Sequence, residues 1–186
     1  MGYYYYYNDK HPEEASDLEI LFELLSSVEN EIVEFKAASN GFDFHKLGQY
    51  FSAISNEANL KNKRFGWLVF GVHDTTHAIL GTNYKNNATA LEKLKHDVAK
   101  ETTGAISFMD ILELHPVVDG QEHRVLMFKI PAAAIAIPTG WKNRYYGRDG
   151  ESLVDLSQEK IDRIDETLRE VSEGMEDYIK LAVCNG

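Results

Sequence analysis

Four segments of the chain repeat apolar residues at intervals of three and four, which is the spacing of one face of a helix. These segments cover residues 17–28, 44–56 and 90–101 and a final stretch that begins at Ser157. In the final stretch the repeat runs through Ile161, Ile164, Leu168, Val171, Met175 and Tyr178. The pattern therefore predicts four helices, of which the last is long, with a heptad-like seam that favours either packing on its own domain or a homodimer.

Strand patterns lie between the predicted helices. Residues 32–37 alternate apolar and charged side chains. Glu34 and Lys36 are expected on the face of this strand that points away from the core, within reach of a ligand. Residues 67–72 form a continuous apolar run, which is typical of a central strand buried on both faces.

The second half of the chain carries turn signals. The pair Asp119-Gly120 joins strands predicted over residues 106–118 and 124–130. A strand over 141–146 and a turn over 147–150 follow. Helices and strands in this order predict an α/β (α+β) fold, in which helices cover a mixed β-sheet.

Length and composition agree with this fold and indicate how the chain is divided. The 186 residues, 44% of them hydrophobic, suit one domain over residues 17–165. A tyrosine-rich arm over 1–16 would precede it, and 166–186 would hold the end of the last helix and a tail. No apolar run is long enough to span a bilayer and no secretory leader is visible. The single cysteine, Cys184, favours a reducing cytoplasm.

Charge is distributed unevenly along the chain. The net charge of -11 argues against nucleic acid as a partner, but residues 36–148 hold ten acids and fourteen bases. The acids in excess lie in the two flanks, 1–35 and 149–186. The pattern indicates a mildly basic centre between acidic flanks, which either contributes a binding surface or merely keeps the protein soluble.

Three carboxylates are the candidates for chemistry. Glu29 and Glu34 are five residues apart, and Asp74 follows the buried strand. Hard cations such as Mg²⁺ and Mn²⁺ prefer oxygen ligands and can activate water beside a phosphodiester. Lys36, on the face of Glu34, is positioned to contact a phosphate. An exposed acidic edge without function explains the same acids.

Basic and aromatic residues form two further candidate groups. They are expected to contact the backbone and the unstacked bases of a nucleic acid, although an ordinary solvated surface has the same composition. The residues are Lys61, Lys63, Arg64, Lys142, Arg144, Tyr145, Tyr146 and Arg148.

Other motifs are weak or missing. His73 and His77 are four residues apart around a turn, a poor arrangement for zinc. Neither GxxxxGK[ST] nor GxGxxG occurs, so the sequence offers no cradle for ATP or a dinucleotide.

Several of these segments together resemble the Schlafen AlbA-type domain family, formerly described as a divergent AAA ATPase group. ENEIVEFK at residues 29–36 resembles the acidic opening of that family, and the strand and turn over 66–74, GWLVFGVHD, resemble its GV-D strand. RVLMFKIPAA and RYYGRDGESLVDLS resemble later strands and a YxRxGS-like turn. The resemblance extends from about residue 29 to 164.

The resemblance implies an α/β domain that associates with nucleic acid. Some Schlafen relatives are metal-dependent endoribonucleases that use three carboxylates, and Glu29, Glu34 and Asp74 match those positions. Bacterial relatives often carry the domain in front of ATPase-like or winged-helix parts and are described as transcriptional regulators. The family's glycine pair before the strand is Phe65-Gly66 here, a departure from the pattern.

Three hypotheses result. The first is a nucleic-acid-binding module, for RNA or DNA, in a bacterial regulatory or defence protein. The second is a metal-dependent endoribonuclease. The third is an oligomerisation scaffold that uses the last helix and Tyr3–Tyr7.

Overall fold

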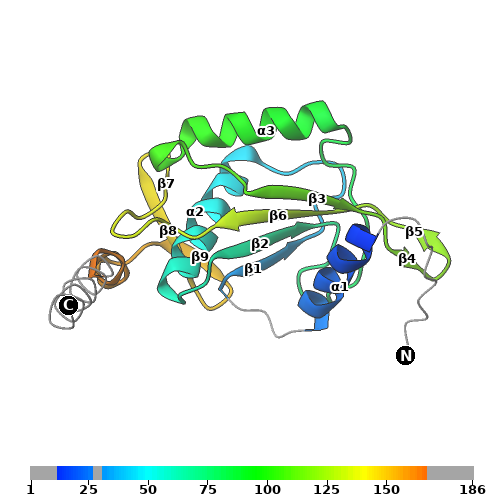
Figure 1. Cartoon of the computed structure of the whole chain (residues 1–186), viewed down its shortest axis with the longest axis horizontal. Coiled ribbons are helices and arrows are strands. Elements are labelled where there is room, and N and C mark those ends of the chain that lie inside the picture. The colour runs from blue at the N-terminus through cyan, green and yellow to red at the C-terminus, as the bar shows by residue number, and fades with distance from the viewer. Residues whose placement is uncertain (1–11, 27–30, 167–186) are drawn as a thin grey trace, which may run out of the picture.

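The structure is a computed structural model that describes residues 12–26 and 31–166, with side chains from Asp17 onward (Figure 1). Glu29, the tyrosine run and the end of the C-terminal seam lie outside these residues. The described helices are α1 (Pro12–Ser26), α2 (Phe44–Leu60), α3 (Ala88–Glu101), the short 3₁₀ helix η1 (Thr103–Ala105) and a C-terminal helix over 158–166. No helix among the described residues is long and apolar enough to cross a membrane.

Nine strands form three sheets within the described ranges. The first sheet has the order β1-β2-β6-β3, made of β1 (Val33–Lys36), β2 (Phe65–Phe70), β6 (Val125–Pro131) and β3 (Asp110–Leu114). The second joins β4 (Val117–Val118) to β5 (Gln121–Glu122), and the third has the order β7-β8-β9, made of β7 (Gly140–Trp141), β8 (Arg144–Asp149) and β9 (Ser152–Asp155). β1 runs parallel to β2, whereas every other pairing of these strands is antiparallel. The predicted mixed sheet with helical cover is confirmed.

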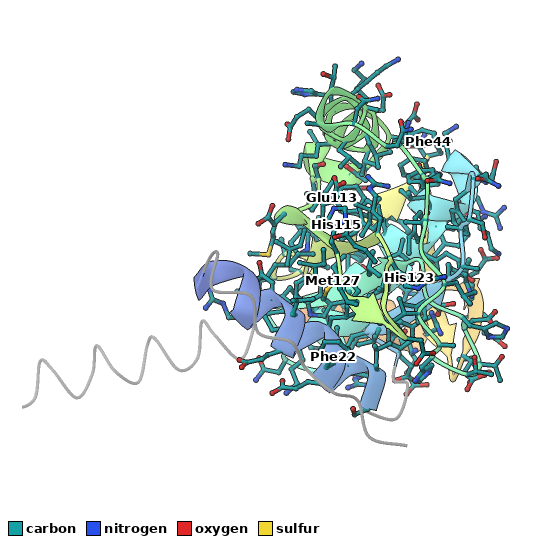
Figure 2. The ribbon with its side chains drawn as sticks, turned by 90° about the vertical axis from the view of Figure 1, so that its right-hand side faces the viewer. Phe22, Phe44, Glu113, His115, His123 and Met127 are labelled. Atoms are coloured by element: carbon teal, nitrogen blue, oxygen red, sulfur yellow. The ribbon has the colours of Figure 1, made fainter. Side chains whose placement is uncertain are left out.

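Helices cover both faces of the four-stranded sheet, and in Figure 1 α2 and α3 lie on one side of it and α1 on the other. On the first face, Ile54 of α2 and Leu94 of α3 share a core with Phe128 of β6. On the other face, the core includes Leu21 of α1 and Met127 of β6, and Figure 2 shows Met127 beside α1. β2 is buried on both faces, as its continuous apolar run predicts.

The three-stranded sheet packs against α2 through polar side chains. Asn56 donates to the carbonyls of Thr139 (3.0 Å) and Tyr146 (2.9 Å) and accepts from the backbone N–H of Thr139 (2.8 Å). Ser52 donates to Thr139 O (2.7 Å) and accepts from Tyr146 N–H (3.0 Å). These side chains are buried and fully paired, so α2 holds both β7 and β8 in a fixed position.

The predicted strand over 141–146 and the turn over 147–150 differ from the structure. The chain reverses at Lys142 and Asn143, both with positive φ (49° and 61°), and β8 continues to Asp149. Consecutive left-handed residues make a tight hairpin whose twist matches the strands. The tight turn that follows is centred on Gly150 and Glu151, so Arg148 belongs to a strand and not to a loop.

The turn at Asp119-Gly120 is confirmed, but the strand predicted over 106–118 is divided into β3 and β4, and the turn joins β4 to the short strand β5. Asp119 and Gly120 adopt positive φ (50° and 77°) between β4 and β5. The described part of the C-terminal helix is short, and Ser157 Oγ accepts from Lys160 N–H (3.3 Å) at its start. The proposed homodimer seam continues through residues outside the described part of the chain.

Candidate functional site

A surface pocket of about 420 Å³ lies at the carboxyl ends of the parallel strands β1 and β2. Glu34 and Lys36 come from β1, Tyr50 from α2, and a third group from the loop that follows β2. The lining residues are Glu34, Lys36, Tyr50, Asp74, Thr75, His77 and Glu151. Ligand sites commonly form where parallel strands end, because the chain leaves the sheet there and opens a crevice.

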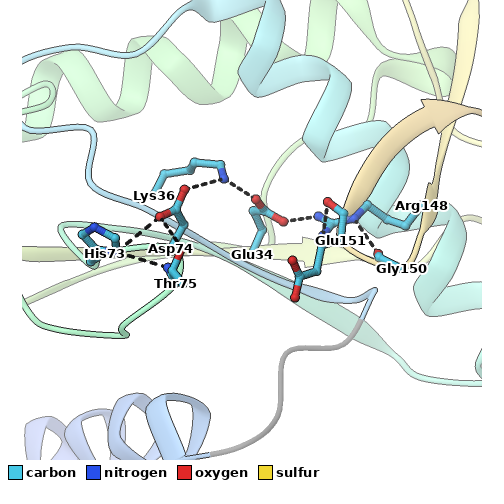
Figure 3. Close-up of polar contacts among 8 residues, drawn as sticks. All are labelled: Glu34, Lys36, His73, Asp74, Thr75, Arg148, Gly150 and Glu151. Atoms are coloured by element: carbon cyan, nitrogen blue, oxygen red, sulfur yellow. Dashed lines mark hydrogen bonds and ion pairs between the residues drawn. The ribbon is translucent and has the colours of Figure 1, made fainter.

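The Lys36 ammonium lies between two carboxylates in this pocket (Figure 3). Its Nζ is 2.5 Å from Glu34 Oε1 and 3.8 Å from Asp74 Oδ2. Glu34 is 4% exposed, the Lys36 side chain 21% and the Asp74 side chain 55%. The pair Glu34 and Lys36 therefore lies on one face of β1 as predicted, but Glu34 is buried and Lys36 is the group that a ligand reaches.

Burial and charge act in opposite directions on Lys36. Desolvation lowers the pKa of its ammonium, but the hydrogen bond and charge of Glu34 outweigh this, so that the pKa lies above its usual value. Burial, followed by the charge of Glu34, raises the pKa of the Tyr50 phenol. At neutral pH the pocket therefore holds a charged lysine and a neutral phenol that can donate a hydrogen bond.

Arg148 lies behind Glu34, with 1% of its side chain exposed. Its Nη1 pairs with Glu34 Oε2, its Nη2 donates to the carbonyl of Glu151 (3.0 Å), and its Nε donates to the carbonyl of Gly150 (3.4 Å). Glu34 thus contacts a cation through each of its oxygens. Arg148 and Tyr146 (4% exposed) are predicted from the sequence to contact nucleic acid, but their burial removes both from the accessible surface.

A second buried carboxylate supports β8 from α2. Glu57 is 2% exposed, and its Oε1 accepts from the backbone N–H of Arg148 (2.8 Å) and from Lys160 Nζ (2.5 Å). Lys160 also donates to the carbonyl of Arg148 (2.6 Å). The C-terminal helix is therefore tied to the strand that carries Arg148.

The two histidines of the loop after β2 point to different partners. His73 Nδ1 accepts from the backbone N–H groups of Thr75 (3.2 Å) and Thr76 (3.3 Å), which assigns the proton to Nε2. Its 3.3 Å contact with Asp74 Oδ1 is then no ion pair. His77 Nδ1 donates to the carbonyl of Leu25 (3.1 Å). These hydrogen bonds shape the loop that carries Asp74.

The described residues do not by themselves fit a divalent cation. Both Glu34 oxygens contact cations, and the Lys36 ammonium lies between Glu34 and Asp74, where a metal would sit. No group of three His, Cys, Asp or Glu side chains in the described ranges could hold a metal ion. Glu29, the third expected ligand, lies outside those ranges.

The remaining predicted basic residues are exposed and fall into two groups. Lys61, Lys63 and Arg64 follow the C-terminal end of α2. Lys142 and Arg144 lie in the β7–β8 hairpin, beside the N-terminal end of α2, where Trp141 contacts Phe44 (ring centroids 5.1 Å apart). A helix of 17 residues is about 25 Å long, so these five basic residues form two groups near opposite ends of α2.

Two of these cations are already paired. Lys61 lies 2.5 Å from Glu31, and Arg144 lies 2.9 Å from Asp155. Such exposed pairs contribute little energy, so they hold either cation only weakly.

Sequence reasoning missed four residues of the site. Tyr50 fits the apolar face of its helix. Glu151 lies within the segment RYYGRDGESLVDLS but is not singled out there, and Glu57 and Lys160 carry no signal of a site. The only signal available was that Tyr50 follows Leu47 by three residues and so shares its inward face. Their proximity to Glu34 depends on how β8 and β9 pack, which one sequence does not reveal.

Comparisons with known proteins agree with the fold. The family model described as "Schlafen, AlbA_2" matches residues 29–157. Among solved structures, the DIP2311 protein from Corynebacterium diphtheriae is similar, with a TM-score of 0.54 and 19% sequence identity. The match covers 83% of this chain and 29% of that chain, and at this identity it shows the fold alone. No curated protein matches the chain.

Proposed function

Since the chain belongs to the Schlafen AlbA_2 family, as its motifs indicate, we propose that it binds nucleic acid, RNA or DNA, in a regulatory or defence role. The family itself is associated with nucleic acid, and the finer assignment rests on the site. The observation that carries the proposal is the Lys36 ammonium, partly exposed in a pocket at the ends of β1 and β2.

Lys36 is suited to a phosphate for two reasons. Its elevated pKa keeps it charged at neutral pH, and its neighbour Tyr50 can donate a second hydrogen bond to a phosphate oxygen. The carboxylates of Glu34 and Asp74 hold the ammonium in place but also repel a phosphate, so Lys36 fixes the position of the phosphate and contributes only part of the affinity.

The exposed cations would supply the rest of the affinity. Lys63, Arg64 and Lys142 form no ion pair among the described residues. They lie toward the two ends of α2, with Lys36 and Tyr50 beside its middle. A single strand of several nucleotides covers the length of this helix, and Tyr145, 39% exposed, offers a surface for stacking.

Fluorescence anisotropy with labelled single-stranded RNA and DNA tests the binding proposal. Affinity should fall steeply between about 50 and 200 mM salt, because phosphate contacts release counterions. Replacing both Lys63 and Arg64 by Gln should weaken binding, and the salt slope should fall by roughly 1 for each phosphate that the variant no longer neutralises.

Lys93→Gln is the matched control, because Lys93 is exposed on α3 and away from the pocket. It should leave the salt slope unchanged. Equal slopes for the wild type, the Lys63 and Arg64 variant and this control would reject the assigned surface, and absence of salt-dependent binding would reject the function.

A second candidate function is RNA cleavage, favoured by the presence of two carboxylates, Glu34 and Asp74, in the lining of one pocket. In this proposal Glu29, Glu34 and Asp74 would hold Mg²⁺ or Mn²⁺, and Lys36 would contact the phosphate. Lys36 would have to move from between the two carboxylates for a metal to enter. No step through the metal follows from the described arrangement.

Incubation of the purified protein with total tRNA and Mn²⁺, or with EDTA, separates the two candidates. Cleavage that needs Mn²⁺ and disappears in Glu34→Gln, but persists in the exposed control Glu159→Gln, would establish an enzyme. Cleavage that survives in EDTA or in Glu34→Gln would exclude a catalytic metal held by these carboxylates. Binding without cleavage would support the first candidate, a nucleic-acid-binding module.

A further inference from the structure

The guanidinium of Arg148 joins two walls of the pocket that are far apart in the sequence. It pairs with Glu34 on β1 and donates to the carbonyls of Gly150 and Glu151 in the β8–β9 turn. Figure 3 draws these contacts in one continuous series from Asp74 through Lys36 and Glu34 to the turn. Nothing in the proposed function assigns a role to this arginine, which itself is too buried to touch a ligand.

We propose that Arg148 is a positioning residue: it aims the Glu34 carboxylate at Lys36 and fixes the Gly150–Glu151 turn as a wall of the pocket. The effect on binding rests on the proposed function, because it requires that Lys36 contacts the nucleic acid. The positions of the Glu34 carboxylate and of the Gly150–Glu151 turn depend on Arg148 whether or not a ligand binds.

The shape of the guanidinium, and not only its positive charge, supports this role for Arg148. A lysine would supply the positive charge that a buried carboxylate needs. Only the planar fork of an arginine donates from separate nitrogens to a carboxylate and to two carbonyls in fixed directions. With Oε2 of Glu34 held by Arg148, Oε1 is left to contact Lys36 Nζ at 2.5 Å.

Glu151 is the second group that Arg148 positions. Its side chain lines the pocket, while its backbone carbonyl accepts from Arg148 Nη2. Tight turns at a sheet edge are otherwise among the least constrained parts of a fold. The hydrogen bond therefore helps to fix the backbone from which the Glu151 side chain extends.

The backbone of Arg148 has anchors of its own. Its N–H donates to Glu57 and its carbonyl accepts from Lys160, and β8 pairs with β9 through the same region. Side-chain replacement at Arg148 leaves these contacts in place. We therefore expect Arg148→Lys to fold.

The test compares Arg148→Lys, which keeps the charge, with Arg148→Gln, which removes it. Arg163→Lys, exposed on the C-terminal helix, is the matched control. We expect both Arg148 variants to lose affinity for the single-stranded probe at least tenfold, while the control binds as the wild type does. Crystal structures of the Arg148 variants should show the Glu34 carboxylate turned away from Lys36 and the turn at Gly150 displaced.

Wild-type affinity in Arg148→Lys, with Glu34 still on Lys36, would overturn the inference, because charge alone would then suffice. If the wild type itself binds no nucleic acid, the proposed function fails. The position of Glu34 in the variant crystals then decides the structural claim separately: a displaced carboxylate supports it and an unmoved one overturns it.

If the Arg148 variants fail to fold, the Glu34→Asp variant tests the same inference. It keeps the charge but shortens the side chain, so that one carboxylate no longer reaches both Arg148 and Lys36. We expect the same reduction of at least tenfold in affinity. Wild-type affinity in a folded Glu34→Asp protein would overturn the inference.

Discussion

Glu34 and Lys36 alternate with Val33 and Phe35 along β1, and this alternation separates a charged face from an apolar one. The sequence predicted this division correctly. It did not predict that α2 and β8 cover the charged face, because alternation states which side chains share a face and not what packs on it. The burial of Glu34 thus depends on Tyr50 and Arg148, which are distant in sequence.

Tyr84 provides a prediction at the scale of one residue. Burial, with a smaller contribution from the charge of Asp43, raises the pKa of its phenol to about 12 from 10.0. Between these two pH values the unfolded chain releases a proton that the folded protein retains. The stability supplied by the neutral phenol is therefore complete below pH 10 and is lost as the pH rises toward 12.

Urea unfolding at several pH values measures this loss. Above pH 10 the free energy of unfolding should fall less in Tyr84→Phe than in the wild type. At pH 12 the two losses should differ by up to about 2.5 kcal/mol. Identical pH profiles for the two proteins would mean that Tyr84 is accessible to solvent in the folded state.

Among the elements, α2 contributes most to the site. Its apolar positions pack on the sheet, and its polar positions Ser52, Asn56 and Glu57 hold β7 and β8. The sequence predicted the apolar face and the start of this helix at Phe44 correctly. The polar face gave no signal, because buried serine and asparagine are indistinguishable from exposed ones until their partners are known.

Gly48 allows a prediction about this helix. A Cβ at this position would lie 1.9–2.3 Å from ring atoms of Trp141, which is fully buried. Alanine is more favourable than glycine inside a helix by about 1 kcal/mol. Overpacking against a buried indole costs about 1–3 kcal/mol. Because contacts of 1.9–2.3 Å are far inside van der Waals distance, the steric cost should lie in the upper part of this range, at about 2–3 kcal/mol. After the helical gain is subtracted, Gly48→Ala is expected to destabilise the protein by about 1–2 kcal/mol.

The urea midpoint of Gly48→Ala reports this cost. Gly41→Ala is the control, because a Cβ at Gly41 meets nothing within 4 Å and should change stability by less than about 0.5 kcal/mol. A Gly48→Ala protein as stable as the wild type would show that the Trp141 hairpin moves away from α2 at no energetic cost.

In the whole molecule, the C-terminal helix is joined to the site through Lys160. Its ammonium contacts Glu57 (2.5 Å) and the carbonyl of Arg148 (2.6 Å), and Ile164 is fully buried further along the helix. The described start of this helix therefore packs on its own domain. This is one of the two arrangements that its heptad-like seam allowed.

Lys160→Met should destabilise the folded domain by about 2 kcal/mol, because it leaves the buried Glu57 carboxylate with a single backbone donor. The free energy of urea unfolding is the measurement. Glu159→Gln, an exposed neighbour, should stay within about 0.5 kcal/mol of the wild type. Equal values for both variants would mean that water replaces Lys160 without penalty.

The sequence alone determined most of the helices, the central strand and the family. Periodicity located the helices and the buried central strand, because apolar spacing reflects how each element packs on a core. Spaced motifs from about residue 29 to 164 indicated the Schlafen AlbA family, whose model matches residues 29–157. Local turn chemistry predicted the turn at Asp119-Gly120. Each of these signals lies within a short segment or in a pattern shared by relatives.

Only the tertiary structure decided which charged groups meet. The sequence pattern places Arg148 in a turn that contacts nucleic acid, whereas β8 carries it beneath Glu34. The fold divides the exposed basic candidates between the two ends of α2 and brings Lys36 between Glu34 and Asp74. Charges that are more than a hundred residues apart pair only after the chain has packed, and the low dielectric of a buried site then makes that pairing decisive.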